Sequence, residues 1–391
     1  MRTAVRTHTF SESVIRGMTR LANEHGAINL AQGFPNFPAP DVLKRAAAQA
    51  IHDDINQYAI TWGSERLRRA LVAKYATWYG MMVDPVAEIT VTCGATEAMA
   101  SVMLALVNPG DQVVVLEPFY ENYGPDAILC EAEPVYVPFL PGEPLDLDRL
   151  AAAFGPKTRA IIVNTPNNPT GRVLSLEELT AIAELCIRHD AYAITDEIYE
   201  HIYYEGKHIP IATLPEMANR TITVSGASKT FSVTGWRVGT IVAPQDLTDA
   251  IRKVHDFLTV CAPAPFQRAL VEALRLPESY YEEVRAAYGR RRELLSRGLE
   301  RAGWRVNRPQ GTYFLLVDVR ELGIPDDREW AIRLARERGV AGVPGSAFLW
   351  RGMPQPRGEA PDRRGTFLRL SFGKREEQLE RAVERLANGP R

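Results

Sequence analysis

The segment TITVSGASKTFSVTGWRVG, residues 221–239, decides the fold of this chain. Its first four residues, Thr221–Val224, alternate threonine with branched apolar residues and predict a short buried strand. The small residues that follow leave room for a ring-sized ligand beside Lys229. An amine in a desolvated, cationic neighbourhood loses its proton readily and can attack a carbonyl carbon to form an imine. A lysine at a strand end can equally be a solvated surface charge, and the rest of the chain has to decide between these interpretations.

Short apolar runs alternate with helical stretches on both sides of this segment, from about residue 46 to 280, which is typical of βα units around a mostly parallel sheet. The predicted strands are Ile89–Cys93, Val113–Leu116, Ala160–Val163, Ala191–Thr195 and Thr221–Val224. Periodicity predicts helices over Thr96–Val107 and Leu176–Arg188. Ser175 and Glu178 form a capping-box pair in front of the second helix.

The C-terminal part has a different pattern. A long amphipathic stretch at Glu278–Arg301 is followed by two predicted strands and two predicted helices. These elements are Tyr313–Val319, Phe367–Phe372, the helix near Arg328–Arg338 and the helix near Arg375–Leu386. We therefore predict an α/β fold with a large domain over 46–280 and a smaller α+β domain over 281–391. Residues 1–45 are expected to form an N-terminal arm and part of the small domain.

Composition excludes several classes of function. The 391 residues carry 46 basic and 48 acidic side chains, a net charge of −2, so nucleic acid is not an expected partner. No run approaches the length of a membrane span, and the start MRTAVRTHTF lacks a signal-peptide core, so we expect a cytoplasmic protein. Four scattered cysteines and seven scattered histidines show no metal-binding spacing, so no metal is expected.

A candidate anion site lies where the predicted strand Ile89–Cys93 runs into a helix. Gly94, Ala95 and Thr96 open that helix, and its free N–H groups and partial positive charge attract a phosphate. The hydroxyl of Thr96 adds a donor, and Arg237 offers a matching positive charge. A glycine at this junction can also do no more than ease the turn.

Two more strand ends carry polar candidates. Asp196 and Tyr199 follow Ala191–Thr195, and a carboxylate beside a pyridine nitrogen keeps that nitrogen protonated. Tyr199 can hydrogen-bond a phenolate oxygen on the same ring; the alternative is a capping aspartate and a packing tyrosine. The run Asn164–Gly171 is too rich in turn formers for ordinary linkage. Asn168 precedes a proline, which favours an extended backbone, and its amide can bond both a cofactor and a substrate carboxylate.

In this order, these sites resemble the fold-type I enzymes that use pyridoxal 5′-phosphate (PLP), specifically the class I/II aminotransferases of the aspartate aminotransferase superfamily. The motifs are N-P-x-N-P-T-G-like at Asn164–Gly171, D-E-x-Y at Asp196–Tyr199 and G-x-S-K…G-W-R-x-G at Gly226–Gly239. The resemblance covers essentially the whole chain. It implies a ping-pong transfer of an amino group from an amino acid to a 2-oxo acid, in a homodimer with shared active sites.

The resemblance also implies a role for each matching residue. Lys229, Asp196 and Tyr199 would be catalytic, with Lys229 holding the cofactor covalently and moving protons. The cofactor would be bound by Gly94, Ala95, Thr96, Tyr120, Asn168, Asp196, Tyr199, Lys229, Arg237 and Tyr58, the last from the neighbouring subunit. The substrate would be bound by Gly33, Asn168 and Arg369. One departure is Gly226, where many relatives have a phosphate-binding serine; Ser225 or Ser228 can compensate.

The substrate is narrowed by three runs that look like the kynurenine aminotransferase / glutamine transaminase K branch: 29–38, 56–58 and 255–258. That likeness implies an aromatic amino acid, methionine, glutamine or a kynurenine-like donor. Two other activities remain open on the same scaffold: an aspartate aminotransferase and a β-lyase acting on cysteine S-conjugates. Cys261 stands where animal kynurenine aminotransferases have a histidine, so the donor is not decided by sequence.

Overall fold

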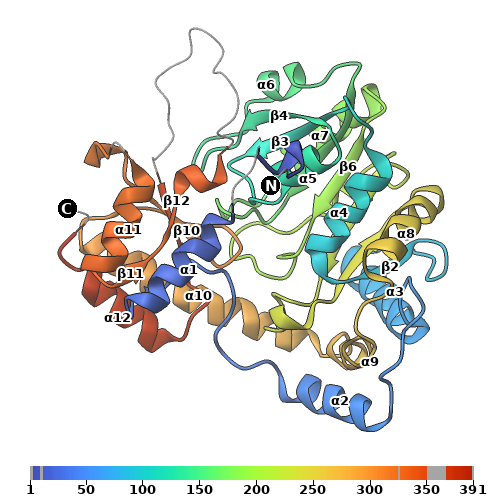
Figure 1. The fold of residues 1–391 in the computed structure, drawn as a ribbon, viewed down its shortest axis with the longest axis horizontal. Coiled ribbons are helices and arrows are strands. Elements are labelled where there is room, and N and C mark those ends of the chain that lie inside the picture. The colour runs from blue at the N-terminus through green and yellow to red at the C-terminus, as the bar shows by residue number, and fades with distance from the viewer. Residues whose placement is uncertain (1–2, 9–11, 325, 350–366, 390–391) are drawn as a thin grey trace.

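A computed structural model describes residues 3–8, 12–324, 326–349 and 367–389. Its central element is a seven-stranded sheet with the order β2-β8-β7-β6-β5-β3-β4 (Figure 1). The strands are β2 (Ile89–Thr92), β3 (Gln112–Glu117), β4 (Glu133–Pro138), β5 (Thr158–Asn164), β6 (Tyr192–Asp196), β7 (Thr221–Gly226) and β8 (Gly239–Val242). Strand β8 runs antiparallel to both of its neighbours, and the remaining pairs are parallel.

Helices cover both faces of this sheet, which explains why its strands are apolar without alternation. Val113 and Val115 of β3 pack with the helix α4, whereas Val114 and Leu116 point to the other face and pack with α7. The helices of this part are α2 (Asp41–His52), α3 (Glu65–Tyr79), α4 (Gly94–Leu106), α5 (Tyr123–Leu129), α6 (Leu147–Ala152), α7 (Leu176–Arg188), α8 (Gln245–Thr259) and α9 (Ala264–Ala273).

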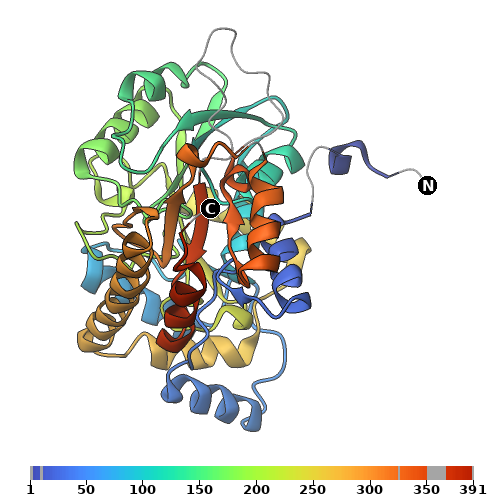
Figure 2. The same cartoon turned by 90° about the vertical axis from the view of Figure 1, so that its left-hand side faces the viewer.

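The C-terminal elements form a second layer beside the large sheet. An antiparallel sheet has the order β12-β13-β10-β9, and helices α10 and α12 lie side by side against it (Figure 2). The elements are α10 (Glu278–Arg301), β9 (Arg305–Asn307), β10 (Phe314–Asp318), α11 (Asp327–Glu337), β11 (Val340–Ala341), β12 (Val343–Pro344), β13 (Phe367–Ser371) and α12 (Glu376–Leu386).

The N-terminal segment belongs in space to these C-terminal elements. Helix α1 (Val14–Glu24) packs on α11, and β1 (Ile28–Asn29) pairs in parallel with β11 (Figure 1). Ile198, Tyr199 and Ile202, from the turn after β6, join the same hydrophobic cluster as Tyr313, Phe314 and Leu370. The turn that carries Tyr199 therefore lies between the two parts of the molecule.

The structure confirms the α/β fold, the mostly parallel sheet and every predicted strand, with shifts of one or two residues at the ends. The helices Leu176–Arg188 and Glu278–Arg301 begin and end as predicted, and Ser175 with Glu178 forms the predicted capping box. Helix α4 begins at Gly94, two residues before the predicted Thr96. Strands β4 and β8 were not predicted. The domain limits at 45 and 280 stay a prediction.

Candidate active site

The ends of three neighbouring strands bring the predicted polar residues together. Asn164 at the end of β5 is in register with Asp196 at the end of β6, which is in register with Val224 of β7. The Asn164 side chain donates from Nδ2 to the backbone oxygen of Asp196 (2.8 Å) and accepts at Oδ1 from the backbone N–H of Asn168 (2.7 Å). One side chain thus fixes the spacing of two predicted site residues.

Lys229 lies in the turn that follows β7 and is partly buried. Its Nζ donates to the backbone oxygen of Gly33 at 3.2 Å. Burial lowers the pKa of Lys229 to about 8; Asp196 opposes this change, and the guanidinium groups of Arg237 and Arg369 add to it. A lysine with this pKa is partly neutral near physiological pH, so it can act as a nucleophile and as a base.

Asp196 is 8% exposed at the end of β6. Its Oδ2 accepts a hydrogen bond from the hydroxyl of Tyr123 (2.7 Å), and its Oδ1 accepts from the backbone N–H of Ile198 (3.3 Å). Burial raises the pKa of Asp196, whereas the Tyr123 hydrogen bond and the nearby Lys229 charge lower it. A buried carboxyl that accepts from one hydroxyl and one backbone N–H, and that forms no ion pair within the described part of the chain, suits a cationic ring nitrogen as its partner.

At the candidate anion site, Arg237 can pack against Gly94 because glycine has no side chain. Gly94 has φ +81°, and a Cβ atom there would lie 2.5 Å from Nη2 of Arg237. Gly239 likewise approaches the start of α4, because its Cβ would lie 2.5 Å from the carbonyl carbon of Gly94. The Cys93 side chain does not cap α4. The first turn, with Ala95 and the exposed Thr96, therefore presents backbone N–H groups beside an exposed guanidinium, an arrangement whose chemistry suits an anion such as a phosphate.

Arg369 forms the other end of the site. It is 1% exposed on β13, and it donates from Nη1 to Oδ1 of Asn168 (2.8 Å) and from Nη2 to the backbone oxygen of Ala31 (2.7 Å). Its guanidinium carbon lies 4.1 Å from the ring centroid of Phe314 and 4.7 Å from that of Phe348. Burial lowers the pKa of Arg369 to about 10, so the group stays charged at neutral pH. A guanidinium held by neutral acceptors keeps its charge available for a carboxylate.

The remaining predicted residues occupy different positions. Tyr199 is 3% exposed, and its ring lies edge-on to that of Tyr313 with the centroids 5.3 Å apart. Tyr120 is partly buried beside Tyr123, and burial raises its pKa to about 12. Tyr58 is 83% exposed.

Gly226 has a physical reason to remain glycine, because a Cβ atom there would lie 2.9 Å from the backbone oxygen of Val238. The expectation that Ser225 or Ser228 compensates for the missing phosphate serine stays a prediction. Ser225 is 1% exposed, and its Oγ donates to Oε1 of Glu200 at 2.5 Å. Ser228 is partly exposed and stays available for that role.

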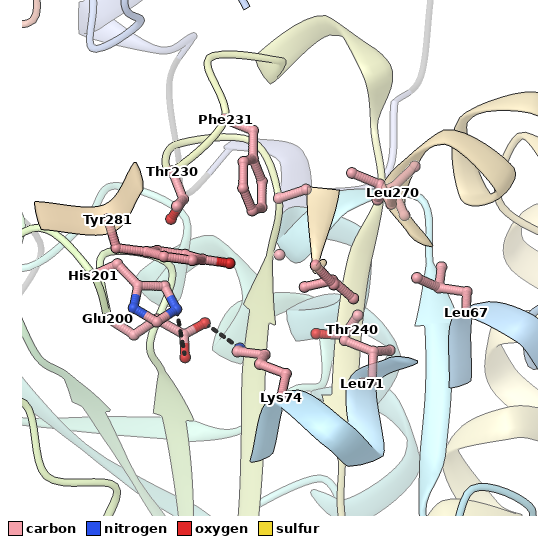
Figure 3. A pocket seen from close by; sticks show the side chains of 14 residues that line it. Leu67, Leu71, Lys74, Glu200, His201, Thr230, Phe231, Thr240, Leu270 and Tyr281 are labelled. Carbon is pink, nitrogen blue, oxygen red and sulfur yellow. Dashed lines mark hydrogen bonds and ion pairs between the residues drawn. The ribbon is translucent and has the colours of Figure 1, made fainter. Parts of the chain in front are cut away.

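A small cavity of about 30 Å³ lies beside the Lys229 turn, and none of the predicted site residues line it (Figure 3). Lys74 and Glu200 form a buried ion pair at its wall (2.5 Å), and Tyr79 donates to the same carboxylate (2.5 Å). Burial raises the pKa of Glu200, but Lys74, with smaller contributions from His201 and Ser225, outweighs burial and lowers this pKa to about 2. This network ties α3 to the turn after Asp196, so it supports the site structurally.

Sequence reasoning missed several residues that contact the predicted ones. Tyr123 holds Asp196, Asn164 holds both Asp196 and Asn168, and Phe314 and Phe348 enclose Arg369. Asn164 was part of a recognised motif and could have been found there. The aromatic residues carry no local signal, because their role depends on chain segments that meet only in the folded protein.

These groups define a class of protein: an enzyme that holds a phosphorylated aldehyde cofactor at a lysine and binds a carboxylate substrate next to it. The residues fit PLP, because the missing side chain of Gly94 lets the Arg237 guanidinium lie against the start of α4, and the buried Asp196 and the partly buried Lys229 are not paired to each other.

The family pattern "Aminotransferase class I and II" matches residues 25–386, and the chain belongs to this family of PLP-dependent aminotransferases. A Mycobacterium tuberculosis protein named "Probable N-succinyldiaminopimelate aminotransferase DapC" is 40% identical over 98% of both chains. The solved structure of N-succinyldiaminopimelate aminotransferase from that organism matches with a TM-score of 0.93, 39% identity and 99% of both chains covered.

Two other relatives have different activities in their names. Human kynurenine--oxoglutarate transaminase 1 is 36% identical and covers 84% of this chain and 86% of its own. The aspartate/prephenate aminotransferase of Thermus thermophilus is 38% identical over 92% of this chain and 90% of its own. The predicted fold type, enzyme class and cofactor are confirmed, and the donor is not decided by these relatives.

Within the residues described, no helix is both long and apolar enough to cross a membrane.

Proposed function

We propose that this aminotransferase takes its amino group from an L-amino acid with an aromatic, methionine, glutamine or kynurenine-like side chain and passes it to a 2-oxo acid. The observation that carries the proposal is Arg369, a buried guanidinium that is anchored by Asn168 and Ala31 and enclosed by two phenylalanine rings. Such a group binds the α-carboxylate common to all these donors. The choice of donor side chain is supported by the 36% identity with human kynurenine--oxoglutarate transaminase 1.

The cofactor is assigned to the strand-end residues. Gly94, Ala95, Thr96 and Arg237 would hold its phosphate, and the Tyr120 ring would lie against its ring. Asp196 would pair with the ring nitrogen, while Tyr199 and Asn168 would hydrogen-bond the phenolate oxygen. PLP supplies an aldehyde that condenses with amines and a ring that withdraws electrons from the substrate Cα.

Lys229 is assigned the proton transfers. Its lowered pKa would allow the free amine to take the proton from the substrate Cα and to return it to the cofactor carbon that carried the aldehyde. The Gly33 carbonyl, which accepts from Lys229 Nζ, sets the direction from which the amine approaches. Arg369 orients the substrate by its carboxylate, with Asn168 holding the guanidinium in place.

A homodimer is part of the proposal. Tyr58 is 83% exposed and Phe257 is 92% exposed, which is unusual for large aromatic side chains and is typical of an interface. Tyr58 would cross that interface and bind the cofactor phosphate of the partner subunit.

The four cysteines are unpaired, which supports a reducing compartment such as the cytoplasm.

A second candidate donor is N-succinyldiaminopimelate, favoured by the 40% identity with the mycobacterial protein over nearly the whole chain. This donor carries two further carboxylates far from the reacting amine. A site for it would need a cation in addition to Arg369.

The test is an absorbance titration of the purified holoenzyme with a panel of amino acids, which follows conversion of the bound cofactor to its amine form. Conversion by aromatic amino acids, methionine, glutamine or kynurenine supports the proposal. Conversion by N-succinyldiaminopimelate or by aspartate alone would replace the donor. Release of pyruvate and ammonia from a cysteine S-conjugate without an oxo-acid acceptor would indicate a β-lyase instead.

A further inference from the structure

Lys374 is a buried cation that the proposed mechanism does not use. It is 3% exposed, in the turn between β13 and α12. Its Nζ donates to the backbone oxygens of Gln32 (3.0 Å) and Phe34 (3.1 Å), and it lies 4.1 Å from the centroid of the Phe34 ring. One ammonium group therefore contacts the N-terminal loop on both sides of Gly33.

The carbonyl of Gly33, between those of Gln32 and Phe34, also accepts hydrogen bonds from side chains. The oxygen of Gly33 accepts hydrogen bonds from Lys229 Nζ (3.2 Å) and from the hydroxyl of Tyr313 (2.9 Å). Three consecutive carbonyls of the loop thus accept from side chains, and Lys229 is the donor that comes from the large sheet. The loop is the structural link between the C-terminal elements and the reactive lysine.

Burying an ammonium is unfavourable, and among the described residues the contacts that offset the desolvation of Lys374 are two backbone oxygens and one aromatic ring. An apolar side chain would be cheaper at this position if the residue only filled space. Burial lowers the pKa of Lys374 to about 8, and the charges of Arg369 and Lys229 add to this effect. The unfavourable burial of the Lys374 ammonium therefore occurs next to Arg369 and Lys229, where the position of the loop affects substrate binding.

The loop has little freedom to settle elsewhere. A Cβ atom on Gly33 would lie 2.4 Å from Cζ of Phe314, so the backbone packs directly on that ring. The same loop carries the Ala31 oxygen that accepts from Arg369 at 2.7 Å. A shift of the loop would move both the acceptor of Arg369 and the acceptor of Lys229.

We propose that Lys374 is a positioning residue that clamps the loop Ala31–Phe34, so that its Ala31 and Gly33 carbonyls orient Arg369 and Lys229 for substrate binding. The inference rests on the proposed carboxylate-binding role of Arg369. It predicts that loss of the ammonium weakens substrate binding more than it slows turnover, because the reacting groups themselves remain.

The test compares Lys374→Met with Arg375→Met, which removes a neighbouring charge from an exposed side chain. For Lys374→Met we expect KM for the amino donor to rise about tenfold, the scale of one lost charge-assisted hydrogen bond, with kcat reduced less than about threefold. The donor is whichever amino acid converts the cofactor in the absorbance panel, so the test does not depend on its identity.

The second readout is hydrogen exchange of the cofactor-free full-length chain. The backbone N–H groups of Phe34 and Asn36 donate to Gln32 and Gly373, and we expect them to exchange at least about tenfold faster in Lys374→Met than in Arg375→Met. An unchanged KM, or unchanged exchange in this loop, would overturn the proposal. If Lys374→Met does not fold, Lys374→Gln is measured by the same two criteria. If the loop exchanges faster in Lys374→Met but no amino acid converts the cofactor, the proposed function is contradicted. The proposal that Lys374 holds the loop would still be supported.

Discussion

The two ends of the active site are built in different ways. At the proposed phosphate end, Gly94 follows β2 and Arg237 precedes β8, which are adjacent strands of one sheet, and the two residues fit together because Gly94 lacks a side chain. At the carboxylate end, Arg369 binds Asn168 and Ala31, which are 201 and 338 residues away in the chain. The phosphate end is thus fixed by sheet topology, whereas the carboxylate end exists only when the C-terminal elements and the N-terminal loop close on the large sheet.

Lys229 lies between the two ends, and its removal gives the largest expected effect. In Lys229→Ala we expect transamination to fall by at least about 10,000-fold, because the variant lacks the amine that is assigned to attach the cofactor and move the proton. Steady-state rates with the best donor measure this loss, and dialysis followed by absorbance shows whether PLP still binds noncovalently. Retained turnover would show that the lysine does not have the assigned role.

Substitution of the two arginines separates the ends directly. Arg369→Met should raise KM for the amino acid about 100-fold and leave PLP affinity unchanged, since a charged partner of the carboxylate is lost. Arg237→Met should weaken PLP binding by a similar factor, with a smaller effect on the donor KM of the fully loaded enzyme. Cofactor titration and steady-state kinetics measure both quantities. If each variant impaired both quantities equally, the two ends would not be separate binding units.

A pair of glycines tests the phosphate end more finely. Gly94 and Gly110 both have φ +81°, but a Cβ atom at Gly110 meets nothing within 4 Å, whereas one at Gly94 meets Arg237. Alanine should cost each position about 1 kcal/mol of folding free energy from the backbone conformation. Only Gly94→Ala should also weaken PLP binding, by about tenfold, because it displaces the guanidinium. Equal PLP affinity in the two variants would remove Gly94 from the proposed phosphate end.

An effect on stability, with none expected on binding, concerns Asp126 of α5, the helix that carries Tyr123. Asp126 is 6% exposed, its Oδ2 has no partner among the described residues, and burial raises its pKa to about 7. The folded chain therefore keeps a proton that the unfolded chain releases near pH 4, so this group's contribution to stability is lost as pH rises toward 7.

Asp126→Asn should consequently stabilise the fold more at pH 8 than at pH 5, by roughly 2 kcal/mol. Urea unfolding of both proteins at the two pH values measures this difference, and the donor KM and PLP affinity serve as controls that should not change. A pH-independent difference would mean that Asp126 is ionised in the folded protein throughout this range.

Sequence reasoning succeeded where the signal is local. The apolar runs at β2, β3, β5, β6 and β7, the capping box of α7 and the turn formers after β5 are all readable from neighbouring residues. It failed at β8, because Gly239–Val242 is short and directly follows the Thr234–Gly239 motif. It also could not show that the hydroxyl of Ser225 in β7 donates to Glu200, which lies in the turn after β6.

The sequence by itself determined the fold type, the enzyme class, the cofactor and the motifs around Lys229, because a catalytic motif must keep residue types at fixed spacings along a short segment. Only the tertiary structure decided which groups those residues contact: Tyr123 on Asp196, Phe314 and Phe348 around Arg369, and Lys374 on the loop of Gly33. The physical reason is that burial and hydrogen-bond partners come from segments hundreds of residues apart, and no pattern within one segment records which of them it will meet.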